Sequence, residues 1–170
     1  MTDTNGQPLD ADQALAGLSG HGIIAGFGIP GRAVANLFEA RRFPFCVIER
    51  NPATVDRCTT AGLPIFQGDA TDEADLRRAG IERAVVVALA MPNESAVLTA
   101  IPLARRLNPG LKILARCRHV STTMEAARLG ADEVLSEEQV VGEAFARAAG
   151  PLVPAGAGSD GVGATTTRQG

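Results

Sequence analysis

Short apolar runs alternate along the chain with longer segments in which apolar residues recur at helical spacing. The short runs have the length of strands and predict six of them, at residues 21–25, 45–48, 64–66, 84–88, 112–115 and 133–135. The segments between them predict five helices, at about 30–42, 52–61, 72–80, 93–107 and 120–129. Strands and helices that alternate in this order are typical of an α/β protein with a parallel sheet.

The run Val85-Val86-Val87 is apolar at consecutive positions, which predicts a strand covered on both faces, as at the centre of a parallel sheet. Right-handed crossovers leave few ways to connect such strands. We therefore expect a doubly wound, six-stranded parallel Rossmann sheet of order 3-2-1-4-5-6. Because such sheets bind ligands at the carboxyl ends of their strands, where the order reverses, the residues after strands one and four are the first candidates for a site.

The 170 residues, of which 45% are hydrophobic, suffice for one ordinary domain. We expect a tail with a short helix at residues 1–20, the Rossmann domain at 21–149, and a second tail at 150–170. The polar and glycine-rich composition of residues 1–8 and 151–170 predicts disorder at both ends.

Charge and cysteine content narrow the function. The formal net charge is -3 and the arginine pairs are scattered, so no basic face for nucleic acid is expected. No apolar run approaches the roughly 20 residues of a membrane span, which argues against direct membrane insertion. The three cysteines lack metal-ligand spacing and fit a reducing cytoplasm.

The first predicted strand leads directly into a glycine-rich loop and then a helix, as a dinucleotide-binding fingerprint requires. The loop reads Gly26-Phe27-Gly28-Ile29-Pro30-Gly31. Gly26 permits a tight turn, Gly28 lets a pyrophosphate approach the backbone, and Gly31 lets the helix pack closely on the strand. The helix N-terminus would offer N–H groups and partial positive charge to the phosphates.

Glu49 ends the second predicted strand, near the usual spacing of about 20 residues at which a carboxylate accepts hydrogen bonds from ribose hydroxyls. A carboxylate there repels a 2′-phosphate, which favours NAD or an unphosphorylated adenosine over NADP. The alternative is an ordinary surface glutamate. The neighbouring Arg50 could suggest the opposite preference, for a 2′-phosphate. It is weaker evidence than Glu49, because neighbouring residues of a strand point in opposite directions. Its guanidinium could instead lie on the adenine.

Polar residues also follow the third and fifth predicted strands. The third leads into Gly68-Asp69-Ala70-Thr71, where Asp69 could accept a hydrogen bond from the adenine amino group and Thr71 could be a helix N-cap. Arg116 ends the fifth strand within reach of a phosphate, although an ion pair with Asp132 or Glu133 is an equal alternative. His21 and His119 have no catalytic or metal-binding neighbours, so we expect surface or capping roles.

Several of these motifs resemble one family. They are HGIIAGFGIPGRAVA, VIERN, GDATDEADLRRAGIERA, ILARC and MEAARLGADEVLSEEQVV. Residues 21–149 resemble the N-terminal half of an RCK domain, also called KTN or TrkA-N, a cytoplasmic nucleotide-binding regulator of potassium channels, potassium uptake systems and cation/proton antiporters. The resemblance implies phosphates at the glycine loop, ribose at Glu49, adenine at Asp69 and Ala70, and a phosphate near Arg116. It also implies that Leu89 and Ala90 line the pocket.

Two departures from the family pattern bear on the choice of nucleotide and on the presence of a second lobe. Many relatives have an arginine at the position of Ile29, where it can touch a phosphate, so ATP is disfavoured here relative to NAD(H), AMP or ADP. The family's C-terminal ligand-binding lobe does not follow residue 150. Residues 137–149 resemble the crossover helix through which such domains pair, and their apolar stripe predicts a homodimer or a higher assembly.

We therefore expect a non-catalytic nucleotide sensor that controls a potassium or other monovalent cation channel or antiporter, recruited to the inner face of the plasma membrane by that partner. One alternative is an NAD-dependent oxidoreductase, which would need a proton-transfer residue and a substrate domain. The single lysine, Lys112, begins a strand at the opposite edge of the sheet. The other alternative is a ligand-free dimerisation module.

Overall fold

The computed structural model describes residues 15–153, and the expectations for the two ends lie mostly outside this range. Six parallel strands form one sheet of order β3-β2-β1-β4-β5-β6. This confirms the predicted doubly wound topology. The strands are β1 (Gly22–Ala25), β2 (Phe45–Glu49), β3 (Ile65–Gln67), β4 (Val86–Leu89), β5 (Lys112–Cys117) and β6 (Glu133–Ser136).

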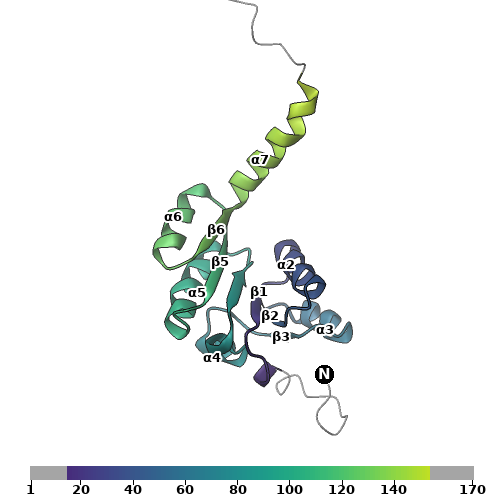
Figure 1. The fold of residues 1–170 in the computed structure, drawn as a ribbon, viewed down its shortest axis with the longest axis vertical. Coiled ribbons are helices and arrows are strands. Elements are labelled where there is room, and N and C mark those ends of the chain that lie inside the picture. Colours follow the sequence, from purple (N-terminus) through teal and green to yellow (C-terminus); the bar gives the residue numbers. More distant parts are fainter. Residues whose placement is uncertain (1–14, 154–170) are drawn as a thin grey trace, which may run out of the picture.

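Helices cover both faces of the sheet (Figure 1). They are α2 (Ile29–Ala40), α3 (Pro52–Thr60), α4 (Glu73–Arg78), α5 (Glu94–Leu107), α6 (Val120–Arg128) and α7 (Glu137–Ala149), with short 3-10 turns η1 (Ile81–Arg83) and η2 (Gly150–Leu152). Adjacent strand residues enter different cores, because side chains alternate across a strand. Ile23 packs in the larger core with α4, α5 and α6, whereas Ile24 packs in the smaller core with α2 and α3.

Local sequence signals set the helix boundaries. Pro30 and Pro52 lie in the first turns of α2 and α3, where a missing N–H costs nothing. Gly62, Gly80 and Gly130 follow α3, α4 and α6 with φ values of +80°, +74° and +112°. These left-handed conformations end the helices and favour glycine.

Two sequence expectations about β4 and α4 were wrong in detail. Val85 precedes β4 and is 46% exposed, so the fully covered part of this strand begins at Val87. The N-cap of α4 is Asp72, not Thr71, since the Asp72 carboxylate accepts a hydrogen bond from Ala74 N at 2.7 Å. The Thr71 hydroxyl instead donates to Asp69.

His21 was expected in a surface or capping role and is instead fully buried. Its Nε2 lies 2.8 Å from the carbonyl oxygen of Ala79, and its Nδ1 has no partner among the described residues. Burial lowers the pKa of His21, and the nearby Arg83 lowers it further, against the opposing effect of the Ala79 carbonyl. His21 therefore acts as a neutral core residue that joins β1 to the end of α4.

Helix α7 extends away from the sheet beyond β6 and buries none of its residues (Figure 1). Val140, Val141 and Phe145 are 49%, 52% and 74% exposed. The apolar stripe predicted at residues 137–149 is therefore present and uncovered within the chain. Within residues 15–153 no helix is long and apolar enough to cross a membrane.

Candidate functional site

The glycine loop turns sharply between β1 and α2. Gly26 has a φ of +90°, and a Cβ at this position would lie 3.1 Å from the backbone of Met91. A Cβ on Gly31 would lie 2.0 Å from the carbonyl oxygen of Gly26. Both positions therefore require glycine, because α2 packs directly on the loop and the loop packs on the segment after β4.

Gly28 differs from the other two glycines of the loop, Gly26 and Gly31, because the space beside it is open. The nearest atom to a Cβ there would be Pro30 Cδ at 3.9 Å, and the residue is exposed. Gly28 is the N-cap of α2, and no side chain caps this helix. The N–H groups of the first turn thus face a surface without a competing carboxylate, which is the arrangement that binds phosphate at helix N-termini.

Glu49 reaches into the loop from the end of β2. Its Oε2 accepts a hydrogen bond from Phe27 N at 2.7 Å, and its Oε1 accepts one from Asn51 N at 2.8 Å. The side chain of Phe27 is buried in the smaller core, so its backbone N–H is held in place. Each carboxylate oxygen keeps a further lone pair, which leaves Glu49 able to accept hydrogen bonds from two neighbouring hydroxyls.

Asp69 and Arg50 extend the same edge of the sheet past β3. Asp69 Oδ1 accepts hydrogen bonds from Thr71 N at 2.9 Å and Thr71 Oγ1 at 2.7 Å, and Arg50 Nε lies 3.5 Å from Asp69 Oδ2. Burial raises the pKa of Asp69, but the hydrogen bonds from Thr71 and the charge of Arg50 outweigh it and hold the pKa below its ordinary value. Arg50 itself is 69% exposed and can move.

Gly68 and Ala70 flank Asp69 in this segment. Gly68 N donates to the carbonyl oxygen of Glu49 at 3.0 Å, which aligns the end of β3 with the end of β2. Ala70 is buried and exposes almost no surface at the site edge. The structure therefore brings the polar groups after β2 and β3 to one side of the glycine loop.

Arg116 lies on the other side of the loop, at the end of β5. The expected ion pair with Asp132 or Glu133 is not the one observed. Arg116 Nε and Nη2 lie 2.6 and 2.5 Å from Glu137 Oε1, and Nη1 donates to the carbonyl oxygen of Ala90 at 3.2 Å. Asp132 faces the opposite edge of the sheet, where it pairs with other cations.

The strand register aligns the residues that stand at the carboxyl edge of β1, β4 and β5 in one row. Ala25, Leu89 and Ala115 are register partners in β1, β4 and β5. The next residues along each strand are Gly26, Ala90 and Arg116, which therefore stand level at the carboxyl edge. Leu89 and Ala90 are 1% and 5% exposed, so both residues are buried and expose little surface at this edge.

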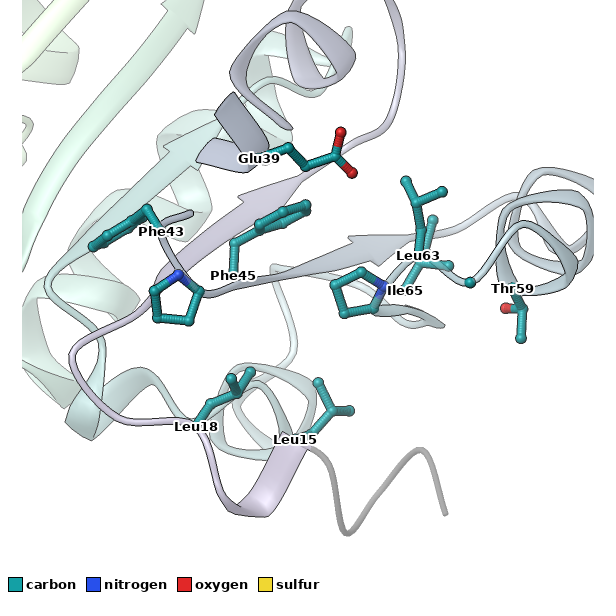
Figure 2. A pocket seen from close by; sticks show the side chains of 11 residues that line it. Leu15, Leu18, Glu39, Phe43, Phe45, Thr59, Leu63 and Ile65 are labelled. Atoms are coloured by element: carbon teal, nitrogen blue, oxygen red, sulfur yellow. The ribbon is translucent and has the colours of Figure 1, made fainter. Parts of the chain in front are cut away.

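A separate apolar cavity of about 470 Å³ lies at the opposite edge, where β2 and β3 begin (Figure 2). Leu15 and Leu18 line one side, and Phe45 and Ile65 line the other. Sequence reasoning missed this cavity because its walls come from segments far apart in the chain. It shares no lining residue with the glycine-loop site. No group of three or more metal-ligating side chains occurs within residues 15–153.

Known proteins are similar to this chain in sequence. The family model of the TrkA-N domain matches residues 22–137. A putative K(+) efflux antiporter KefB from Alkalimonas amylolytica is 34% identical over 131 residues, which are 77% of this chain and 20% of that protein. The chain thus spans about a fifth of the length of this relative.

Two solved structures share the fold. The TrkA-N domain of the inner membrane protein YbaL from Escherichia coli superposes with a TM-score of 0.74 at 24% identity, covering 78% of this chain and 98% of that one. The Kef CTD of Shewanella denitrificans in its AMP-bound form superposes with a TM-score of 0.63 at 27% identity, covering 75% of this chain and 80% of that one. The chain belongs to the TrkA-N domain family.

Proposed function

We propose that this domain is a non-catalytic nucleotide sensor whose ligand binds across the glycine loop at the carboxyl edge of β1. The observation that carries the proposal is the joint geometry of Gly28 and Glu49. An open, uncapped helix N-terminus for phosphate stands beside a carboxylate already hydrogen-bonded to the same loop. Phosphate and ribose of one adenosine nucleotide can occupy these two positions together.

The ligand proposed is NAD(H), AMP or ADP. Glu49 repels the 2′-phosphate of NADP, and Asp69 offers an acceptor to an adenine amino group on the β3 side. ATP is a poorer candidate, because Ile29 provides no cation for a third phosphate. An AMP-bound Kef domain among the similar structures supports this ligand class.

The output proposed is control of potassium or other monovalent cation transport. The KefB-type antiporter relative contains a region similar to this chain, which supports a membrane transporter as partner and a cytoplasmic position at its inner face. The uncovered stripe of Val140, Val141 and Phe145 supports a homodimer through α7. A ligand shifts such an assembly only by as much as it prefers one arrangement.

We propose no catalytic activity for this domain. The row formed by Gly26, Ala90 and Arg116 carries a guanidinium committed to an ion pair and no residue placed for proton transfer. Lys112 lies 3.0 Å from Asp132 at the opposite edge. Steady turnover of NADH by the purified protein would contradict this part of the proposal.

A thermal-melt screen against NAD, NADH, NADP, AMP, ADP and ATP tests the proposal directly. A ligand that binds only the folded state raises the melting temperature, so we expect increases for ligands with an unphosphorylated ribose and none for NADP. Glu49→Ala should abolish them. If no nucleotide shifts the wild-type melting temperature, the sensor proposal fails and the ligand-free pairing module replaces it.

A further inference from the structure

The apolar cavity at the amino edge of the sheet lies where β2 and β3 begin. Helix α2 ends at Ala40 and α3 at Thr60, and the loops that lead from them into the two strands form one wall of the cavity. Leu15 and Leu18 form the wall on the other side (Figure 2). The volume of about 470 Å³ falls within the range of roughly 300–1,000 Å³ that small-molecule pockets have.

Hydrogen-bond donors are scarce on these walls. Pro44 and Pro64 precede the two strands and have no N–H, and their carbonyl oxygens accept from Gly22 N at 2.9 Å and Val47 N at 2.8 Å. Other lining residues donate their backbone N–H groups within the chain, namely Leu18, Phe43, Gly62, Leu63 and Ile65. A bound molecule therefore meets mainly hydrocarbon, which favours an apolar body.

Glu39 supplies the charge of the cavity. It is the only charged side chain among the described residues that line it, and it makes no hydrogen bond or ion pair within residues 15–153. In Figure 2 Glu39 lies on one side of the cavity, and Leu15 and Leu18 lie on the other. A carboxylate only accepts hydrogen bonds, so it attracts an ammonium group and repels phosphates and other carboxylates.

We propose that this cavity binds a small organic cation with a hydrocarbon body and a protonated amine. The body packs against Leu18, Phe45 and Ile65, and the ammonium group lies at Glu39. Charge complementarity with Glu39 argues against nucleotides and other anions as occupants. The cavity shares no lining residue with the glycine loop, so the inference does not rest on the proposed nucleotide site. It assigns a cationic ligand to the edge of the sheet opposite the one where a nucleotide is proposed.

Chemical-shift titration of the full chain with three probes of similar shape tests the inference. Phenylbutylamine, phenylbutanol and phenylbutyrate share one hydrocarbon body and carry positive, zero and negative charge near neutral pH. Phenylbutylamine should shift the amides of Leu63 and Ile65 and leave that of Gly28 unchanged. It should bind about two- to fivefold more tightly than phenylbutanol, as is typical of an exposed ion pair, and phenylbutyrate should bind most weakly. Added salt should reduce the difference between the amine and the alcohol.

Two variants separate the charge of the cavity from its shape. Glu39→Gln should make phenylbutylamine and phenylbutanol bind equally, because the shape is kept and the charge is lost. Glu125→Gln is the matched control, since Glu125 is exposed on α6 and does not line this cavity, and it should keep the preference for the amine. Leu63→Trp should weaken all three probes, because the larger side chain fills the cavity. A thermal melt shows whether each variant is folded, and Glu39→Gln alone decides if Leu63→Trp is not.

The inference would be overturned if no probe shifts the two amides, or if Glu39→Gln leaves the preference for the amine unchanged. Contacts between the methyl groups of Leu9 and Ile65 in the probe-free protein would show that residues 1–14, which lead to the cavity wall at Leu15, fill it themselves. A mass in light scattering that falls as phenylbutylamine is added would show that a second copy of the chain fills it. Either result also overturns the inference, and none of them bears on the nucleotide site.

Discussion

Glu49 Oε2 accepts a hydrogen bond from the backbone N–H of Phe27 at 2.7 Å, which ties the end of β2 to the glycine loop. Glu49→Ala should therefore weaken AMP binding at least tenfold and also destabilise the fold by about 1 kcal/mol, since it leaves the Phe27 N–H without its acceptor. Calorimetry and urea denaturation measure the two effects.

Asn108→Ala is the matched control for that variant. Asn108 Nδ2 donates to the carbonyl oxygens of Ile81 and Ala84 at 2.8 and 2.9 Å, away from the carboxyl edge. Its loss should cost a similar amount of stability and leave AMP affinity unchanged. If both variants lose AMP affinity equally, Glu49 acts through stability and not through the ribose.

Gly28 and Gly31 provide a pair of substitutions with opposite outcomes. Gly28→Ala should keep the stability of the wild type within about 0.5 kcal/mol, because a Cβ there meets nothing closer than 3.9 Å and the φ of -71° suits alanine. It should still weaken nucleotide binding, because the methyl group occupies the approach of the phosphate. Gly31→Ala should destabilise the fold by several kcal/mol, since its Cβ would lie 2.0 Å from Gly26 O. Urea denaturation of both variants measures the two stabilities, and a nucleotide titration of Gly28→Ala measures its binding. Unchanged nucleotide binding by Gly28→Ala would contradict the prediction.

The fold was predictable because its signals are local. The separate destinations of Ile23 and Ile24 follow from strand alternation, and the turns at Gly62, Gly80 and Gly130 follow from the glycines themselves. Strand order then followed from the handedness of crossovers. The tight turn at Gly26 and the close packing of the helix at Gly31 were likewise expected from the spacing of the loop glycines.

Contacts between distant segments were not predictable in this way. The partner of Arg116 is Glu137, although Asp132 and Glu133 are nearer in sequence. Asp132 and Glu133 lie where β6 begins, at the opposite edge of the sheet from Arg116, whereas Glu137 follows the end of β6 as the first residue of α7. His21 is buried because the end of α4 packs over it, and no pattern near residue 21 indicates this. Both outcomes depend on packing between elements, which the sequence pattern does not specify.

Asp132 should make the free energy of unfolding depend on pH. The hydrogen bond from Ile113 N at 2.8 Å, helped by Lys112 and Arg105, lowers the pKa of Asp132 from 3.8 to about 2. Because the folded-state pKa is below the unfolded value, the contribution is complete above about pH 4 and is lost as the pH falls through about 2. Asp132→Asn should therefore cost about 1–2 kcal/mol near neutral pH, allowing for solvent screening, and progressively less below pH 4.

Urea denaturation between pH 3 and 7, with Glu133→Gln as the control, measures this difference. Glu133 is an exposed neighbour on the first position of β6, and its variant should show no such dependence on pH. A cost of Asp132→Asn that stays constant from pH 7 to pH 3 would show that its charge does not contribute.

Phe145 should anchor the proposed homodimer through α7. Phe145→Asp places a charge in the exposed apolar stripe and should halve the mass measured by light scattering. Ala146→Asp is the control, because residue 146 lies on the opposite face of the same helix and carries a similar helix-propensity cost. A Phe145→Asp protein with the wild-type mass would place the interface elsewhere.

Binding of a nucleotide across the glycine loop is tested residue by residue by amide chemical shifts in an isotope-labelled sample. Titration with AMP should shift the amides of residues 26–29, 31, 49–51 and 68–70 and leave those of the apolar cavity at Leu63 and Ile65 unchanged. Shifts confined to the cavity, or no shifts at saturating AMP, ADP and NAD, would show that the glycine loop is not a nucleotide site.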